Sequence, residues 1–162
     1  MTRLSTTHDP ALDQGLRAER HPTCPFCANT VDSLVRLPFE RTADGVSATF
    51  SCDPALCGYQ DMIHGGIIAG ILDAAMTNAL FARDTAAATA RLEIRYPHPL
   101  RPDRLATVTA EVVERTGYGF TTCARIIQED RPVASARATF IALPIKIAGG
   151  SGAPVRAIAV LP

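Results

Sequence analysis

The sequence contains no tryptophan, and aromatic residues make up only 6% of its 162 positions. It has no charge imbalance either, since 16 basic side chains match 16 acidic ones and neither sign forms a long block. A nucleic-acid-binding surface needs a basic stripe or patch, so the sequence predicts no nucleic-acid partner. The first residues contain no apolar segment of the secretory type. We therefore expect a cytoplasmic protein.

Long apolar runs are also scarce, and the one that exists covers residues 65–82. A bilayer is spanned by roughly 20 apolar residues, so this run raises the question of a membrane helix. It contains glycine, threonine and asparagine, however, and a single charged residue, Asp73, near its middle. A helix that is apolar on all sides is equally suited to a protein core. We predict a buried core helix and no membrane partner.

The five cysteines are an odd number, which does not favour a disulfide framework. Cys24 and Cys27 have the spacing of a zinc finger, and with Cys52 and Cys57 they make a possible four-thiolate zinc site. The second pair is one residue longer than that spacing allows, and His21 is a possible substitute ligand. We favour separate thiols, and expect no bound metal and no cofactor.

Alternation of apolar and polar residues predicts strands on both sides of the helix. Asp44-Gly45 is a hairpin signal between the first two strands, 33–42 and 45–52. Strands followed by one helix and more strands, without βαβ alternation, predict an α+β fold in which a curled antiparallel sheet wraps the helix. The side of the helix left open would be covered by a second copy of the chain. We expect an N-terminal arm at 1–28, the main domain at 29–145 and a flexible tail at 146–162, and the later strands within 89–100, 105–117, 120–130 and 133–144.

The candidate chemistry lies at the start and middle of the predicted helix. Gly65 and Gly66 allow a ligand to approach the backbone, and free N–H groups at a helix start polarise a carbonyl oxygen. Asp73 in an apolar setting should have a raised pKa, which suits a general base or nucleophile. Thr77 lies one turn later and can orient it. The alternatives have equal weight: glycines placed for packing, His64 as a helix cap and Asp73 as a buried polar residue at a subunit contact.

The segment HGGIIAGILDAAM, residues 64–76, resembles the signature of hot-dog-fold acyl-CoA thioesterases of the phenylacetate-degradation type. In that family HGG opens the central helix and an acidic residue follows nine positions after the histidine. CPFC at 24–27, GYQDMIHGG at 58–66 and the Tyr-Pro end of TARLEIRYPHPL resemble other family elements, so the resemblance covers about residues 24–143. One departure is Asp61, which stands where many relatives have glycine.

The resemblance implies a hot-dog fold and hydrolysis of an acyl-CoA or aryl-acyl-CoA thioester. Asp73 would act as base or nucleophile, and Gly65 would bind the thioester carbonyl. The remaining implied catalytic residues are His64, Thr77 and Gln60, and the expected substrate-binding residues are Gly66, Asp61, Met62, Arg91 and Arg95.

The resemblance also implies a homodimer in which one subunit's glycine loop lies near its partner's acidic residue, with dimers able to pair into tetramers. The main alternative is a non-catalytic domain of the same fold that binds acyl-CoA as a sensor or scaffold.

Overall fold

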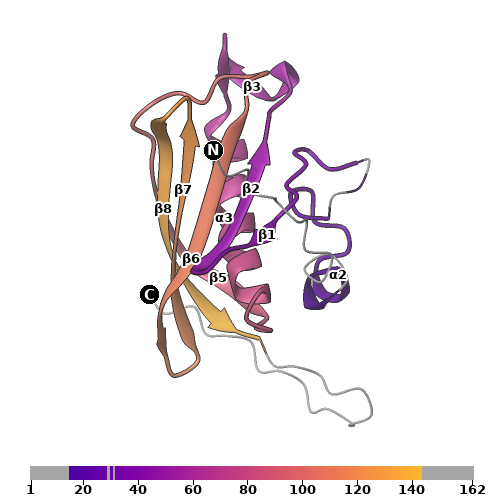
Figure 1. Ribbon diagram of the computed structural model, residues 1–162, viewed down its shortest axis with the longest axis vertical. Helices are drawn as coiled ribbons and strands as arrows, with labels where there is room; N and C mark the ends of the chain where they lie inside the picture. Colours follow the sequence, from indigo (N-terminus) through magenta and orange to yellow (C-terminus); the bar gives the residue numbers. More distant parts are fainter. Residues whose placement is uncertain (1–14, 29, 31, 144–162) are drawn as a thin grey trace, which may run out of the picture.

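The computed structural model describes residues 15–28, 30 and 32–143; the predicted tail and the first 14 residues of the predicted arm lie outside this range. One long helix is enclosed by a curved sheet on one side and by the N-terminal segment on the other (Figure 1). The elements are α2 (Leu16–Arg20), β1 (Glu40–Arg41), β2 (Gly45–Phe50), a 3₁₀ turn (Pro54–Leu56), β3 (Cys57–Tyr59), β4 (Met62–Ile63), α3 (Gly65–Phe81), β5 (Ala87–Arg95), β6 (Ala106–Thr116), β7 (Gly119–Gln128) and β8 (Arg131–Ala142).

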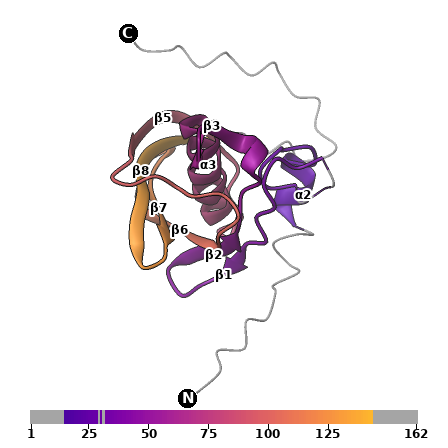
Figure 2. The ribbon, with the colours of Figure 1, turned by 90° about the horizontal axis from the view of Figure 1, so that it is seen from above.

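Six strands form one antiparallel sheet in the order β1-β2-β6-β7-β8-β5. Alternate residues of these strands face α3 and form its apolar bed, as in β8, where Ala134, Ala138 and Phe140 are 0%, 2% and 0% exposed. Viewed from above, the sheet curls around α3 (Figure 2). The predicted α+β arrangement, with a curled antiparallel sheet around one central helix, is therefore confirmed.

The helix α3 begins and ends close to the predicted positions, because the apolar run supplies buried side chains on all sides. From Ala74 to Phe81 every residue is buried. The N-terminal segment covers this half opposite the sheet, where α2 and the turns after it lie (Figure 2), and Cys27 and Leu37 belong to the same core. The expected open side thus exists only along the first half of α3. None of the described helices is long and apolar enough to cross a membrane.

The first predicted strand is much shorter than expected. The hairpin itself is confirmed, with Arg41 opposite Val46. Only two residues precede the turn as a strand, however. Leu34 donates its N–H to the carbonyl of Pro25, 2.8 Å away, and Pro38 has no N–H to donate. Residues 33–39 therefore run over the core as irregular chain.

Strand β5 is the edge of the sheet, and nearly all of its side chains are exposed or half-buried. Its pairing with β8 is regular except at one bulge, where Thr89 is opposite Phe140 and Arg91 is opposite Thr139, so that Ala90 is an extra residue. A bulge reverses which face the neighbouring side chains occupy. This irregularity matters for the site described below.

The loop between β5 and β6 is held by one buried amide. Gln128, 5% exposed at the end of β7, accepts a hydrogen bond from the N–H of Arg101 at 2.9 Å. Its Nε2 donates to the carbonyls of Arg101 and Arg104, at 3.1 and 3.3 Å. One side chain therefore satisfies three backbone groups of this loop.

Candidate active site

The start of α3 is capped by His64. The Nδ1 atom of His64 accepts a hydrogen bond from the N–H of Gly66 over 2.9 Å, so the ring carries its proton on Nε2 in this arrangement. A Cβ on Gly58 would lie 3.0 Å from the ring, so a glycine there makes room for it. The capping alternative for His64 is thus what the structure shows, and the Gly66 N–H is already engaged.

The N–H of Gly65 differs from that of Gly66. Within the described part of the chain, no acceptor pairs with it, whereas the N–H groups of Ile67 and Ile68 bond to the His64 carbonyl. An added Cβ on Gly65 would meet nothing nearer than Tyr96, at 3.9 Å. Packing within the chain therefore does not require glycine at this position. Close approach of a ligand to the backbone would explain why the residue is glycine.

Tyr96 fixes the other side of the helix start. Its hydroxyl donates a hydrogen bond to the carbonyl of Gly65 over 3.2 Å. Burial raises the pKa of Tyr96, so the hydroxyl keeps its proton and remains a donor at neutral pH. This contact ties the end of β5 to the first residue of α3.

A cavity of about 390 Å³ lies beside this helix start. Its walls come from the β3–β4 hairpin, the first turn of α3 and residues 96–99, which include Tyr96 and His98. Tyr59, Met62 and Ile68 make part of the lining apolar. His98, to which the sequence assigns no role, is therefore a wall residue; its place between two prolines gave the only hint of a fixed loop.

Asp73 lies half-buried in the middle of α3, where Thr89 of β5 contacts it. Thr89 Oγ1 donates a hydrogen bond to Asp73 Oδ1 over 2.6 Å. Burial raises the pKa of the Asp73 carboxyl, and the hydrogen bond from Thr89 lowers it by a smaller amount. The raised pKa expected of this carboxylate is therefore present, with burial as its main cause.

Thr89, not Thr77, is the residue that orients Asp73 within the described structure. Thr77 is 4% exposed and makes no hydrogen bond to the carboxylate among the described residues. Strand alternation with Leu92 and Ile94 places Thr89 on the outer face, which is why the sequence pattern misses it. The bulge at Ala90 turns it toward α3. An assisting role for Thr77 stays a prediction.

The three residues expected at the entrance form the end of the β3–β4 hairpin. Gln60 and Asp61 are exposed and Met62 is half-buried. Asp61 has a φ of 57°, in the left-handed region that suits glycine and that aspartate adopts more readily than most other residues. Arg101 Nη1 donates to the Asp61 carbonyl over 2.8 Å and supports the turn. Of the three, Met62 lines the cavity.

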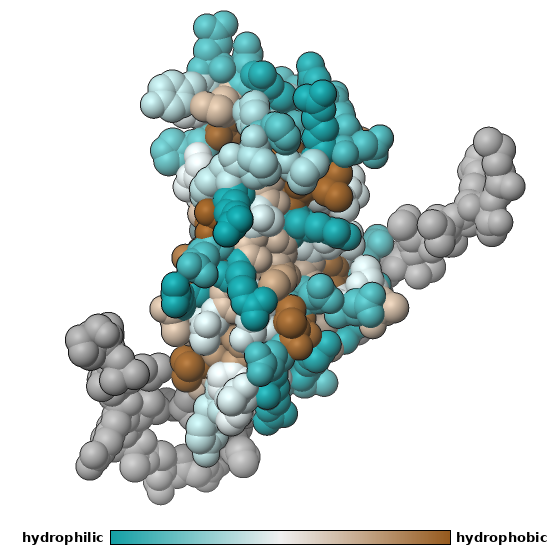
Figure 3. Space-filling view, turned by 90° about the vertical axis from the view of Figure 1, so that its left-hand side faces the viewer, coloured by the Kyte–Doolittle hydropathy of each residue, from teal (hydrophilic) through white to brown (hydrophobic). Residues whose placement is uncertain are grey.

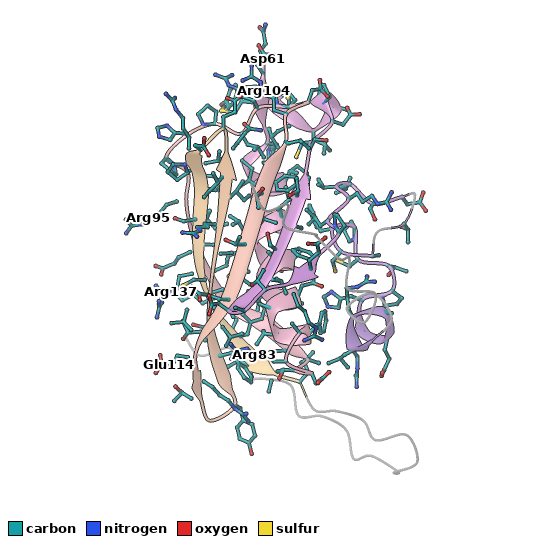
Figure 4. The ribbon with its side chains drawn as sticks, viewed as in Figure 1. Asp61, Arg83, Arg95, Arg104, Glu114 and Arg137 are labelled. Atoms are coloured by element: carbon teal, nitrogen blue, oxygen red, sulfur yellow. The ribbon has the colours of Figure 1, made fainter. Side chains whose placement is uncertain are left out.

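Arg91 and Arg95 are not placed at the cavity in this chain. Arg91 Nη2 pairs with Glu93 Oε1 over 3.0 Å on the exposed edge strand. Arg95 lies along the side of the molecule, well away from Asp61 at the end of the hairpin (Figure 4). It lines a broader hollow of about 1020 Å³ on the sheet.

The face of the molecule seen in Figure 3 is largely hydrophilic, with scattered hydrophobic side chains.

The cysteines do not gather as the four-thiolate alternative requires. Among the described residues, one group has ligand atoms close enough to hold a metal, and it consists of His21, Cys24 and Cys27. Cys52 and Cys57 are not part of it. All five cysteines are free thiols.

Comparison with known proteins gives a partial match to one family model. Residues 60–135 match the family model described as the thioesterase superfamily. This match contains β4, α3 and Thr89, and it begins directly after β3. Among curated protein sequences, none is a significant match to this chain.

Solved structures share the fold. A hypothetical thioesterase from Streptococcus pneumoniae TIGR4, solved with coenzyme A, superposes with a TM-score of 0.61 at 20% identity, over 65% of this chain and 84% of that one. The Escherichia coli PaaI protein of the phenylacetic acid degradation operon gives 0.61 at 18%, over 65% and 78%. The protein smu.793 of Streptococcus mutans UA159, solved with acetyl-CoA, gives 0.61 at 17%, over 65% and 86%. The hot-dog fold is thereby confirmed.

Proposed function

We propose that this chain hydrolyses an acyl-CoA or aryl-acyl-CoA thioester to the free acid and CoA, because it has the hot-dog fold and its residues 60–135 match the thioesterase superfamily model. The observation that carries the proposal is the pair formed by a half-buried carboxylate with a raised pKa and a hydroxyl that orients it, Asp73 and Thr89. A module that only binds acyl-CoA has no use for such a carboxylate. The two CoA-bound structures support this substrate class.

A second correspondence supports the same pair. Separate structures of the Streptococcus pneumoniae protein carry an aspartate-to-alanine and a threonine-to-alanine substitution. The two substituted positions are separated by the same number of residues as Asp73 and Thr89 here. We therefore assign to Thr89 the role of positioning residue for Asp73.

The proposed reaction uses two groups on α3. The N–H of Gly65 donates to the thioester carbonyl oxygen and stabilises the negative charge that develops there. Asp73 takes a proton from a water molecule whose oxygen attacks the carbonyl carbon, or it attacks that carbon itself and the acyl anhydride is then hydrolysed. The C–S bond breaks, and the CoA thiolate leaves and is protonated. The net change in both routes is thioester plus water to acid plus thiol.

One chain cannot bring both groups to one carbonyl. Gly65 and Asp73 are eight residues apart in one helix, which at 1.5 Å per residue separates them by about 12 Å along the axis. A thioester carbonyl is much smaller than that. The Gly65 of one chain must therefore work with the Asp73 of another, as the resemblance implies.

The edge strand is suited to join two chains. β5 is nine residues long, and it has one free edge in the described sheet, since it pairs only with β8. A long exposed edge readily pairs with another strand. In a two-fold dimer, β5 would pair with its own copy and bring the partner's helix toward the open first half of α3. Thr89, and through it Asp73, would lie at this junction.

The decisive experiment is turnover of a panel of short, long and aromatic acyl-CoAs by the wild-type chain and by Asp73→Asn. This substitution keeps the shape and leaves an oxygen that accepts from Thr89, so the fold should persist. We expect hydrolysis by the wild type and a loss of at least about 10²-fold in kcat for the variant. Equal rates would contradict the proposal. Binding of acyl-CoA without hydrolysis across the panel would favour the sensor alternative.

Mixed dimers test whether the site is shared. Asp73→Asn and Gly65→Pro chains should each be inactive alone. When they mix randomly, half of the dimers are mixed and each has one site with both groups intact, so about a quarter of the wild-type activity should return. No recovery, with mixed dimers shown by native mass spectrometry, would place both groups in one chain's site.

A further inference from the structure

A second cluster of reactive side chains lies in the N-terminal segment, near enough to Asp73 for Cys24 and His21 to act on its carboxyl electrostatically. His21, Cys24 and Cys27 place one imidazole nitrogen and two sulfur atoms within 4.8 Å of one another. Cys27 is completely buried, and His21 and Cys24 are half-buried. The proposed hydrolysis uses none of the three.

Backbone hydrogen bonds hold these side chains together. His21 follows α2 directly, and its N–H bonds to the carbonyl of Arg17 over 2.7 Å. The N–H of Ala28 bonds to the carbonyl of Cys24 over 3.1 Å, which closes the turn that contains Cys27. The Arg17 guanidinium also donates to the Cys27 carbonyl. The cluster is therefore a feature of ordered chain.

The separation of its atoms suits one small cation. Cys27 Sγ lies 3.6 Å from His21 Nδ1. Zinc bonds of 2.3 Å to sulfur and 2.0–2.1 Å to nitrogen, at tetrahedral angles, place such a pair about 3.6 Å apart. Two thiolates and an imidazole are donors that zinc prefers, whereas calcium and magnesium prefer oxygen.

Cysteine binds a metal as the thiolate and histidine as the neutral imidazole, so binding at this cluster would release thiol protons and would weaken at low pH.

We propose that His21, Cys24 and Cys27 bind one Zn²⁺ ion that fastens the N-terminal segment to α3, with a water or other small ligand in the fourth position. This inference does not depend on the proposed hydrolysis. The segment contacts α3 beside the cluster, because the ring of His21 lies edge-on to the ring of Phe81, with 5.1 Å between the ring centroids. The Phe26 ring occupies the space that a side chain at Gly70 would fill. The site replaces the four-cysteine set considered from sequence.

Metal content is the first test. The full chain, without a polyhistidine tag, is purified in metal-free buffer, and zinc per chain is measured by mass spectrometry of the elements. We expect about one zinc per chain in the wild type, and a loss in Cys24→Ser. The matched control is Cys57→Ser, another half-buried cysteine, which should retain the ion. Asp73→Asn should also retain it, which separates this result from any loss of hydrolysis.

The visible spectrum of the Co²⁺-loaded chain identifies the ligands, and its first measurement uses the wild-type chain. The wild-type chain loaded with Co²⁺ should show the visible bands of a tetrahedral site and charge transfer from two thiolates. In His21→Cys the charge-transfer intensity should rise by about half, because a third thiolate joins the site.

Three results would overturn the proposal. The first is a wild-type chain that retains neither zinc nor cobalt. The second is equal loss of zinc in Cys24→Ser and Cys57→Ser, which would restore the four-cysteine set. The third is a Cys24–Cys27 disulfide in the chain isolated from cells without reductant, shown by alkylation and mass spectrometry, because that bond consumes both sulfur ligands.

Discussion

Thr89 on the edge strand donates a hydrogen bond to Asp73 on the central helix, with 2.6 Å between the two oxygen atoms. The contact joins two elements at the margin of the sheet, and it exists because a bulge turns Thr89 inward. It is the one described hydrogen bond that favours the charged form of a carboxyl whose burial favours the neutral form. Burial and this hydrogen bond therefore act in opposite directions on the pKa of Asp73.

Replacing Thr89 with valine should shift the pH dependence of hydrolysis. In the proposed mechanism Asp73 acts as a carboxylate, so kcat/KM should fall as the pH drops through its pKa, which burial has raised. Valine keeps the shape of threonine but removes the donor, so the pKa rises further and the acidic limb moves to higher pH. Loss of a hydrogen bond to a charged group corresponds to about one pH unit. Thr89→Ser, which keeps the hydroxyl, should leave the limb near its wild-type position; an unmoved limb in Thr89→Val would contradict this role.

Gly65 offers a substitution that removes a single N–H. Gly65 is the first residue of α3, where proline fits the helix and no helical bond is lost. Its predecessor His64 has ψ of 133°, which is compatible with a following proline. Gly65→Pro should therefore keep the stability within about 1 kcal/mol and lower kcat by about 10²-fold or more.

Gly65→Ala is the matched variant, because it adds a Cβ in open space and keeps the N–H. It should retain more activity than Gly65→Pro under the same assay. If the two variants lose the same activity, close approach to the backbone matters and the donated hydrogen bond does not.

Asp73→Asn should stabilise the protein at neutral pH. The folded chain binds the Asp73 proton more tightly than the unfolded chain, because burial raises the pKa. The native state is therefore favoured most below the unfolded pKa and loses that stability as the pH rises through the folded pKa. Asparagine avoids the buried charge, and we expect a gain on the order of 1 kcal/mol at pH 7. Thermal unfolding should show the gain shrink toward about pH 4; a lower Tm for the variant at neutral pH would contradict it.

Gln128→Met should destabilise the chain through lost hydrogen bonds with little change in volume. Three backbone groups of the β5–β6 loop would lose their partner. Leaving buried polar groups unpaired costs about 1–3 kcal/mol. Denaturant unfolding measures the loss, and Gln60→Met, the same change at an exposed position, should stay within about 0.5 kcal/mol of wild type.

The hydrophobic periodicity and the composition of the sequence predict most of the fold but only part of the candidate site. The run from Gly65 to Phe81 is apolar on all sides, so its burial and length follow directly. Asp73 stands out because it is the single charge in that run. Thr89 does not stand out, because the bulge that directs it is a property of strand pairing and leaves no period in the sequence. For the same reason, the alternation around Leu92, if it is continued back to residue 89, points the side chain of Thr89 to the wrong face.

The cysteine cluster shows a different limit. Spacing identifies Cys24 and Cys27 as a pair, but the choice of further partners depends on how irregular turns fold. Pattern analysis favoured separate thiols, and it considered Cys52 and Cys57 as further zinc ligands with His21, three residues before Cys24, as a possible substitute. The structure groups His21 with the pair because α2 ends there. Likewise, sequence alone suggested a second chain over the open side of α3, whereas the described residues of the N-terminal segment cover that side along the second half of the helix.

The three hydrogen bonds of Gln128 hold the β5–β6 loop, so the two walls of the cavity are supported by different elements. One wall belongs to α3 and carries the groups proposed for chemistry, whereas the opposite wall, Tyr96 to Pro99, is a short proline-rich loop anchored from β7. Changes in that loop can reshape the cavity while the helix keeps its register. We therefore expect sequence differences that change the substrate range among chains of this type to lie mainly in this loop. Substitutions designed to change that range should be made there as well.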